Sequence, residues 1–206
     1  MVRSKLDACF DGSLPSSYVK KAFGSSSSPD SSVMASASPE RCYIEETIMA
    51  ISDSDRDFLR RSEEMQSGSH DPHRQVGVVI VDVDGNVLAT GTNAPPVELG
   101  LSKAESLAAI EADPTWKYFM FEHAERNAIN SARNNGKELR GATMYGTLYP
   151  CADCARAIVA AGISRLVVPG PGGDPLRDNK WREHYRFAHR MFELSGVQVD
   201  IAPMES

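Results

Sequence analysis

The 206-residue sequence has few cysteines, no long apolar run and no excess of basic residues. Four cysteines, two of them in one C-x-x-C at Cys151 and Cys154, do not provide a disulfide framework. No stretch reaches the roughly 18 apolar residues that a membrane helix requires, so no membrane partner is expected. The formal net charge of -6 argues against nucleic acid as a partner, because such proteins usually carry a basic stripe. These absences favour a small-molecule ligand and a reducing compartment.

Residues 1–45 differ in composition from the rest of the chain. Residues 24–38 read GSSSSPDSSVMASAS, eight serines in fifteen residues, which leaves almost nothing to bury. We therefore predict a disordered tail over residues 1–45 and one folded domain over residues 46–206. Organelle targeting by this tail is the less favoured alternative, because Asp7, Asp11 and Asp30 are present and arginine is scarce. A cytoplasmic location is preferred.

The hydrophobic pattern beyond residue 50 alternates between helical and strand character. Strands joined through helices imply at least partly parallel pairing in a layered α/β domain. Ser52 or Ser54 is expected to cap the first helix, and the last helix is expected to bury Trp181, Tyr185, Ala188, Met191 and Phe192. The predicted elements are a helix to about residue 66, a hairpin of strands 76–81 and 87–91, helices 102–112 and 122–135, strand 142–148, helix 152–161, strand 164–168, a loop over 169–175, helix 180–194 and strand 197–201.

Two short motifs carry the chemistry. His123-Ala124-Glu125 is followed downstream by a proline and a C-x-x-C that begins at Cys151. One histidine and two cysteines form a three-ligand set for zinc, and the fourth position that they leave open is typical of a catalytic zinc. Glu125 lies too close to His123 in sequence to be a comfortable fourth ligand, and its expected role is proton transfer.

Each of these residues has a simpler interpretation. Cys151 and Cys154 could form a redox pair or half of a structural zinc site, but no second C-x-x-C exists. His123 alone could be a core histidine. The five residues in this order, H-x-E and then P-C-x-x-C, favour a catalytic site, because that order is the signature of zinc-dependent nucleobase deaminases.

The segment His123-Ala124-Glu125-Arg126-Asn127-Ala128-Ile129 resembles the HAExNAI segment of deoxycytidylate (dCMP) deaminases, and residues 147–156 are similar to their second block. The resemblance runs from about residue 58 to residue 168. It implies a three-layer α/β/α fold with a mixed five-stranded sheet and helices on both faces. It also implies a Zn²⁺ cofactor held by His123, Cys151 and Cys154, hydrolytic deamination at a cytosine ring with Glu125 as the catalytic residue, and a homo-oligomer.

The resemblance also suggests substrate contacts. Asn93 stands where the family hydrogen-bonds the nucleotide near its sugar, although asparagine is also a common turn residue. The backbone around Ala124 is expected to contact the base, and Tyr149 either lines the base pocket or simply packs. The loop after Asn93 reads Ala-Pro-Pro, where dCMP deaminases more typically have a glycine and one proline.

Three functions remain open at this stage. The first is deamination of dCMP to dUMP, with a small nucleotide as the partner. The second uses the same chemistry on guanine, free cytosine, a riboflavin-pathway pyrimidine or adenosine in tRNA. The third is a non-catalytic deaminase-fold subunit, which would be expected to have lost Glu125.

Overall fold

The computed structural model describes residues 51–203. The predicted disordered tail and the boundary at residues 45 and 46 lie outside the described residues and stay predictions. In chain order the elements are α4 (Asp53–Met65), η1 (Gln66–Gly68), β1 (Gly77–Val81), β2 (Val87–Thr92), η2 (Val97–Leu99), α5 (Lys103–Ala112), α6 (Trp116–Met120), α7 (Ala124–Asn134), β3 (Thr143–Gly146), α8 (Ala152–Ala161), β4 (Arg165–Pro169), α9 (Pro175–Ser195) and β5 (Gln198–Ala202).

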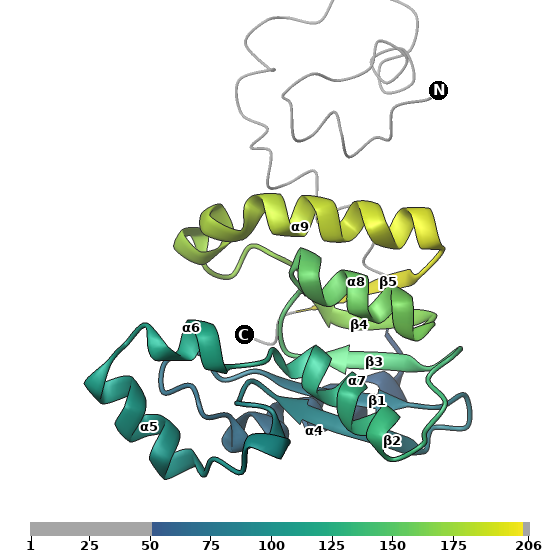
Figure 1. The fold of residues 1–206 in the computed structure, drawn as a ribbon. Coiled ribbons are helices and arrows are strands. Elements are labelled where there is room, and N and C mark those ends of the chain that lie inside the picture. The colour runs from purple at the N-terminus through teal and green to yellow at the C-terminus, as the bar shows by residue number, and fades with distance from the viewer. Residues whose placement is uncertain (1–50, 204–206) are drawn as a thin grey trace, which may run out of the picture. The chain divides into compact units, whose positions relative to one another are not determined.

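The five strands form one mixed sheet in the order β2-β1-β3-β4-β5 (Figure 1). Strand β1 pairs antiparallel with both β2 and β3, whereas β3–β4 and β4–β5 are parallel pairs joined through α8 and α9. Helices α7, α8 and α9 cover one face, and α4 covers the other. The predicted three-layer α/β/α fold with a mixed five-stranded sheet is therefore confirmed.

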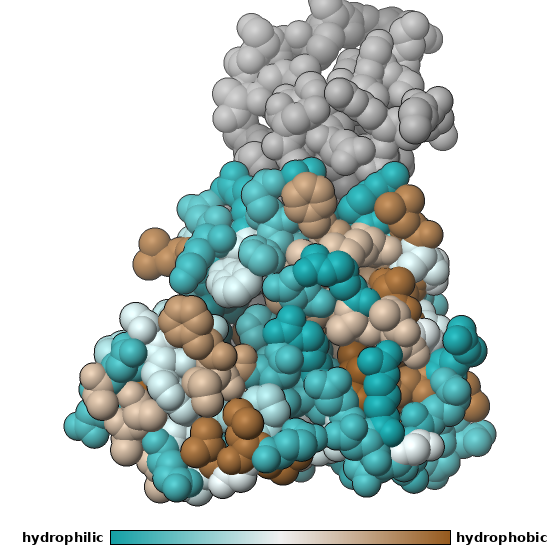
Figure 2. Space-filling model, viewed as in Figure 1, coloured by the Kyte–Doolittle hydropathy of each residue, from teal (hydrophilic) through white to brown (hydrophobic). Residues whose placement is uncertain are grey.

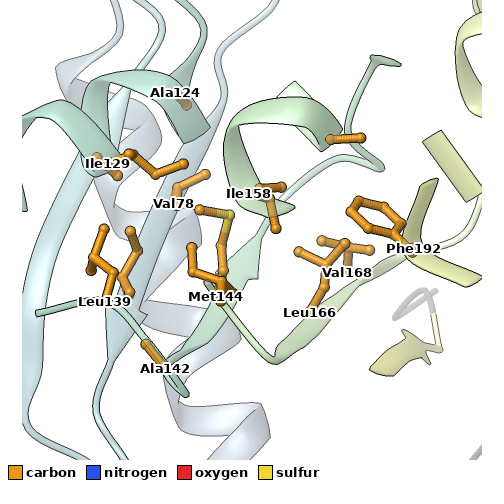
Figure 3. Close-up of a cluster of buried hydrophobic side chains, with 14 of the residues drawn as sticks. Val78, Ala124, Ile129, Leu139, Ala142, Met144, Ile158, Leu166, Val168 and Phe192 are labelled. Atoms are coloured by element: carbon orange, nitrogen blue, oxygen red, sulfur yellow. The ribbon is translucent and has the colours of Figure 1, made fainter. Parts of the chain in front are cut away.

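Successive residues of the central strands point to opposite faces of the sheet. Both faces are covered by helices, so residues on both sides are buried. Val78 and Ile80 pack beneath α7 and α8, whereas Val79 and Val81 pack against α4. All five residues of β1 are buried, as the β-branched run predicts. Figure 3 shows the larger cluster, in which Met144 lies among residues from the helices and strands. The sheet is thus a rigid support for the helix ends that carry the site.

Most predicted helix starts are confirmed. Ser52 and Ser102 each form a capping box, with Asp55 and Glu105 as reciprocal partners. The predicted buried face of the last helix is confirmed at Tyr185, Ala188 and Phe192, whereas Trp181 and Met191 are only partly buried.

One predicted boundary is wrong, and one helix was missed. The last helix starts at Pro175 rather than near residue 180, because Asp174 caps it by accepting a hydrogen bond from the Arg177 amide and proline is favoured in the first turn. The short helix α6 was not predicted at all. It has five residues, which is too short to show a helical period in the sequence.

None of the helices between residues 51 and 203 combines the length and apolar character that a bilayer crossing needs. Figure 2 shows hydrophilic residues over much of one face and apolar residues gathered where Figure 1 has α5 and α6. Exposed apolar side chains of this part of the chain include Val97, Leu99 and Phe119.

The start of α7 is fastened to the end of β2. Ala94 and Glu122 form an isolated bridge, with backbone N–O distances of 2.9 and 3.3 Å. The Asn127 amide donates hydrogen bonds to the Thr92 and Ala94 carbonyls, at 2.9 and 3.1 Å. These contacts hold His123, which lies between Glu122 and the helix, at one edge of the sheet.

Gly91→Ala is expected to destabilise the fold and displace α7. A Cβ on Gly91 would lie 2.3 Å from the Ala124 carbonyl oxygen and 2.6 Å from the Ala128 nitrogen, and both are backbone atoms of α7. Overpacking of this kind typically costs about 1–3 kcal/mol, and here the clash is with backbone. Urea unfolding of the purified variant measures the loss.

Gly68→Ala is the matched control. Its added Cβ would meet only the Thr92 side chain, at ordinary distances of 3.5 Å from the methyl carbon and 4.0 Å from Oγ1. Equal unfolding midpoints for Gly91→Ala and Gly68→Ala would show that β2 and α7 do not approach as closely as described.

Candidate active site

His123 is the residue that precedes α7, and its side chain makes no capping hydrogen bond to the helix. Its imidazole Nδ1 instead lies 3.5 Å from the Cys151 sulfur and 3.4 Å from the Cys154 sulfur. The Glu122 carboxylate accepts a hydrogen bond from the His123 amide at 3.0 Å, which fixes the backbone at this point. The histidine is therefore turned away from its own helix and toward the cysteines.

Cys151 and Cys154 belong to the first turn of α8. Cys151 caps this helix, and its sulfur accepts a hydrogen bond from the Cys154 amide at 3.5 Å. Both cysteines are buried and neither is in a disulfide. A helix N-terminus stabilises thiolate charge, so the position suits metal-binding sulfur atoms.

The three side chains fit a zinc ion. Their ligand atoms all lie within 4.8 Å of one another. Tetrahedral zinc with usual Zn–N and Zn–S bond lengths requires an N···S separation of about 3.6 Å. The observed distances of 3.4 and 3.5 Å agree with that requirement. One nitrogen and two sulfurs could thus hold zinc and leave a fourth position for another ligand.

The protein groups around the cluster favour an ionised sulfur. A hydrogen bond from Cys154, with help from His123, lowers the pKa of the Cys151 thiol to about 4. The same Cys151–Cys154 hydrogen bond, together with burial, raises the pKa of Cys154 well above its usual range. Hydrogen bonding to Cys151 raises the pKa of His123. A bound zinc ion would replace the remaining protons, because these residues coordinate metal in their deprotonated forms.

Glu125 lies in the first turn of α7, next to the three ligand side chains. Its side chain is buried, and burial raises the pKa of its carboxyl. A carboxyl whose pKa is moved toward neutrality can both accept and return a proton at physiological pH. The structure therefore places a carboxyl group suited to proton transfer beside the candidate metal position.

A cavity of about 600 Å³ opens onto this cluster, a size typical of small-molecule sites. His123, Glu125 and Cys151 form part of its lining. Apolar and aromatic side chains provide much of the rest, including Leu148 and Phe121. The space can accept a ring-sized substrate directly against the candidate metal position.

The residues predicted to contact substrate all line this cavity, but they differ in what else they do. The Asn93 side-chain oxygen accepts hydrogen bonds from Ser69 Oγ at 2.7 Å and the Val76 amide at 2.8 Å. Its nitrogen donates to the Arg74 carbonyl at 2.7 Å. Asn93 thus has a clear structural role, and its nitrogen retains one further N–H.

Ala124 and Tyr149 are both buried. The Tyr149 ring meets the Tyr185 ring edge-on at 5.6 Å between centroids, and its hydroxyl lies 3.4 Å from His189 Nδ1. Tyr149 therefore packs against its neighbours and also forms part of the cavity wall.

Sequence reasoning missed the contribution of α9 to the cavity. Arg177, Lys180 and Trp181 line it, and Trp181 was expected only as a core residue. The Trp181 ring lies edge-on to the His123 ring, with 6.3 Å between centroids. The Asp174-Pro175 pair is the signal that could have placed the helix start, and hence these residues, beside the site.

Comparisons with known proteins agree with this geometry. Residues 52–169 match the family model described as the cytidine and deoxycytidylate deaminase zinc-binding region. The "uncharacterized deaminase in luxG 3'region" of Aliivibrio fischeri is 32% identical over 148 residues, which are 72% of this chain and 92% of that protein. A probable deoxycytidylate deaminase of Drosophila melanogaster is 36% identical over 136 residues, 63% of each chain.

A solved structure shares the fold. It is the dCMP deaminase from the cyanophage S-TIM5 in complex with dCMP and dUMP, with a TM-score of 0.54 and 20% sequence identity. The match covers 75% of this chain and 100% of that chain.

Cys151→Ser is expected to lose zinc and stability together. Serine can still cap α8, so a loss of stability in this variant reports on the metal rather than on the cap. Metal analysis and thermal unfolding of the purified variant measure the two effects. Cys9→Ser makes the same chemical change outside the motif and should retain zinc. Stoichiometric zinc in Cys151→Ser would overturn the assignment of this ligand.

Proposed function

Because the chain belongs to the cytidine and deoxycytidylate deaminase zinc-binding family, we propose that it deaminates dCMP to dUMP and ammonia. The chain is a zinc-dependent deaminase, and the named deoxycytidylate deaminases among its relatives favour a cytosine nucleotide over guanine, adenosine or a riboflavin-pathway pyrimidine. The observation that carries the proposal is the cluster of His123, Cys151 and Cys154 with buried Glu125 at one cavity.

In this proposal His123 and the two cysteines bind the zinc ion. When bound, zinc supplies Lewis acidity, which makes a water molecule a better nucleophile near neutral pH. The burial of the two sulfurs keeps bulk water from competing for them. The His123 backbone amide donates a hydrogen bond to the Glu122 carboxylate, which holds the backbone from which the imidazole projects.

Glu125 moves the protons. Its carboxylate takes one proton from the attacking water and delivers it to the ring nitrogen N3. It then takes the second proton from the new hydroxyl group on C4 and delivers it to the amino group, which leaves as ammonia. Burial raises the pKa of its carboxyl, which favours proton uptake, and its place in the first turn of α7 keeps it at the cavity. One side chain can therefore serve as base and then as acid.

The substrate contacts complete the proposal. The remaining N–H of Asn93 donates to the nucleotide near its sugar, and the backbone around Ala124 contacts the base. Tyr149 forms part of the base pocket. Each of these three residues borders the cavity, which supports the assignment.

The enzyme is further proposed to act as a homo-oligomer in the cytoplasm. Thiolate ligands suit a reducing compartment. Exposed apolar side chains such as Val97 and Phe119 suit contacts with another subunit.

The substrate is tested by ammonia release from zinc-loaded protein with dCMP, CMP, deoxycytidine, dCTP, cytosine, guanine and AMP. The expected result is the highest kcat/KM with dCMP, because the named relatives act at the nucleotide level. Activity on another base with none on cytosine nucleotides would retain the zinc chemistry and overturn the proposed substrate.

Glu125→Gln is expected to retain zinc and lose turnover by a factor of about 10² to 10⁴, since glutamine cannot carry the proton. Ammonia release and metal content are measured on the same preparation. Glu111→Gln, at an exposed position on α5, is the control and should keep full activity. Substantial turnover by Glu125→Gln would refute the assigned role.

A further inference from the structure

We propose that Lys180, on α9, is the residue that recognises the phosphate of the substrate. The inference rests on the proposed function, because it assigns a phosphate-binding side chain to the same cavity. The family match ends at residue 169, so it does not cover α9 or any residue on it. The assignment comes from the position and the charge of the residues on this helix.

Helix α9 forms one wall of the cavity through its first three turns. Trp181 fixes this wall to the metal cluster, because its ring meets the His123 ring edge-on at 6.3 Å. Tyr185, one turn further, packs against Tyr149 in the same cavity. Lys180 precedes Trp181 on the same helix, so these aromatic contacts place its backbone beside the metal cluster, and its side chain lines the same cavity.

Four lysine and arginine side chains line the cavity, and three of them already have acidic partners. Lys117 lies 2.8 Å from Asp71, and both side chains are largely buried. Arg177 lies 2.8 Å from Asp178. These two cations are neutralised within the protein and offer little attraction to an anionic ligand.

Arg74 and Lys180 differ from that pair. Arg74 shares a longer contact of 4.0 Å with Asp174, between half-exposed side chains. Among the described residues, Lys180 has no carboxylate within salt-bridge distance. Its ammonium lies 6.0 Å from the centre of the Tyr118 ring, which belongs to α6 on another side of the cavity. Lys180 is thus the one lysine or arginine of the described lining whose charge is not balanced by a carboxylate.

The chemistry of this position suits a phosphate monoester. A lysine ammonium presents up to three donors to phosphate oxygens without requiring a fixed fork geometry. Trp181 borders the metal cluster at the base end, whereas Lys180 lies at the exposed rim beside Tyr118. A nucleotide whose base faces the metal can direct its phosphate to this rim. A nucleoside would leave the ammonium of Lys180 without a ligand.

The test compares binding of the product dUMP with binding of deoxyuridine to zinc-loaded protein by calorimetry. These two molecules differ only in the phosphate, and neither is turned over. We expect the wild type to prefer dUMP and Lys180→Gln to bind it about 10- to 100-fold more weakly, the effect of losing one charge-assisted hydrogen bond. Deoxyuridine affinity should change by no more than about twofold, and Lys180→Arg should recover most of the dUMP affinity.

Lys137→Gln is the matched control, since Lys137 is an exposed lysine beyond the far end of α7. It should leave both affinities unchanged. Equal loss of dUMP and deoxyuridine binding in Lys180→Gln would show a structural role and overturn the proposal. An unchanged dUMP affinity in Lys180→Gln would also overturn the proposal, and a loss of dUMP affinity in Arg74→Gln alone would assign the phosphate contact to Arg74 instead.

Failure of the proposed function is recognised separately. If the protein binds dUMP through Lys180 but releases no ammonia from dCMP, the phosphate site stands and the proposed substrate is wrong. If the protein deaminates dCMP but binds dUMP no better than deoxyuridine, the proposed function stands and only the phosphate site is wrong.

Discussion

The approach of α7 to β2 is the constraint on which the site depends. At Gly91 the two backbones come so close that a single methyl group would not fit between them. The Asn127 amide then ties the helix to the carbonyls at the end of β2. His123 must lie within about 3.5 Å of sulfurs that are 28 and 31 residues away in sequence. An ångström of movement in α7 would be comparable to the tolerance of the metal geometry.

The residues of the candidate metal cluster were predictable from the sequence because their chemistry is concentrated in two short motifs. His123 and Cys151 directly precede helices, so local sequence also fixed how they are presented. The strands of the sheet were equally predictable. Strand β1, for example, is buried on both faces and is therefore a continuous apolar run in the sequence. Ser52 and Ser102 were recognised as caps for the same local reason.

The rest of the cavity could not be predicted, because it depends on contacts between distant segments. The position of Trp181 in the cavity depends on the contact between α9 and His123, and no local sequence pattern predicts that contact. Asn93 was expected to serve a ligand, but its side chain also joins Ser69, the Val76 amide and the Arg74 carbonyl. A functional residue in such a network is hard to separate from a structural one by its type and position alone.

The capping of α7 has a consequence for local unfolding. Of the described helices with ten or more residues, α7 is the one that lacks a side-chain cap, because the His123 ring turns toward the cysteines. Serine, cysteine or aspartate performs that task in the others. In the proposed function, a zinc ion bound by His123 would add a further restraint to the first turn of α7, beside the contacts of Glu122 and Asn127. Zinc would then raise the opening free energy of the same turn that carries Glu125, and metal loss would lower it.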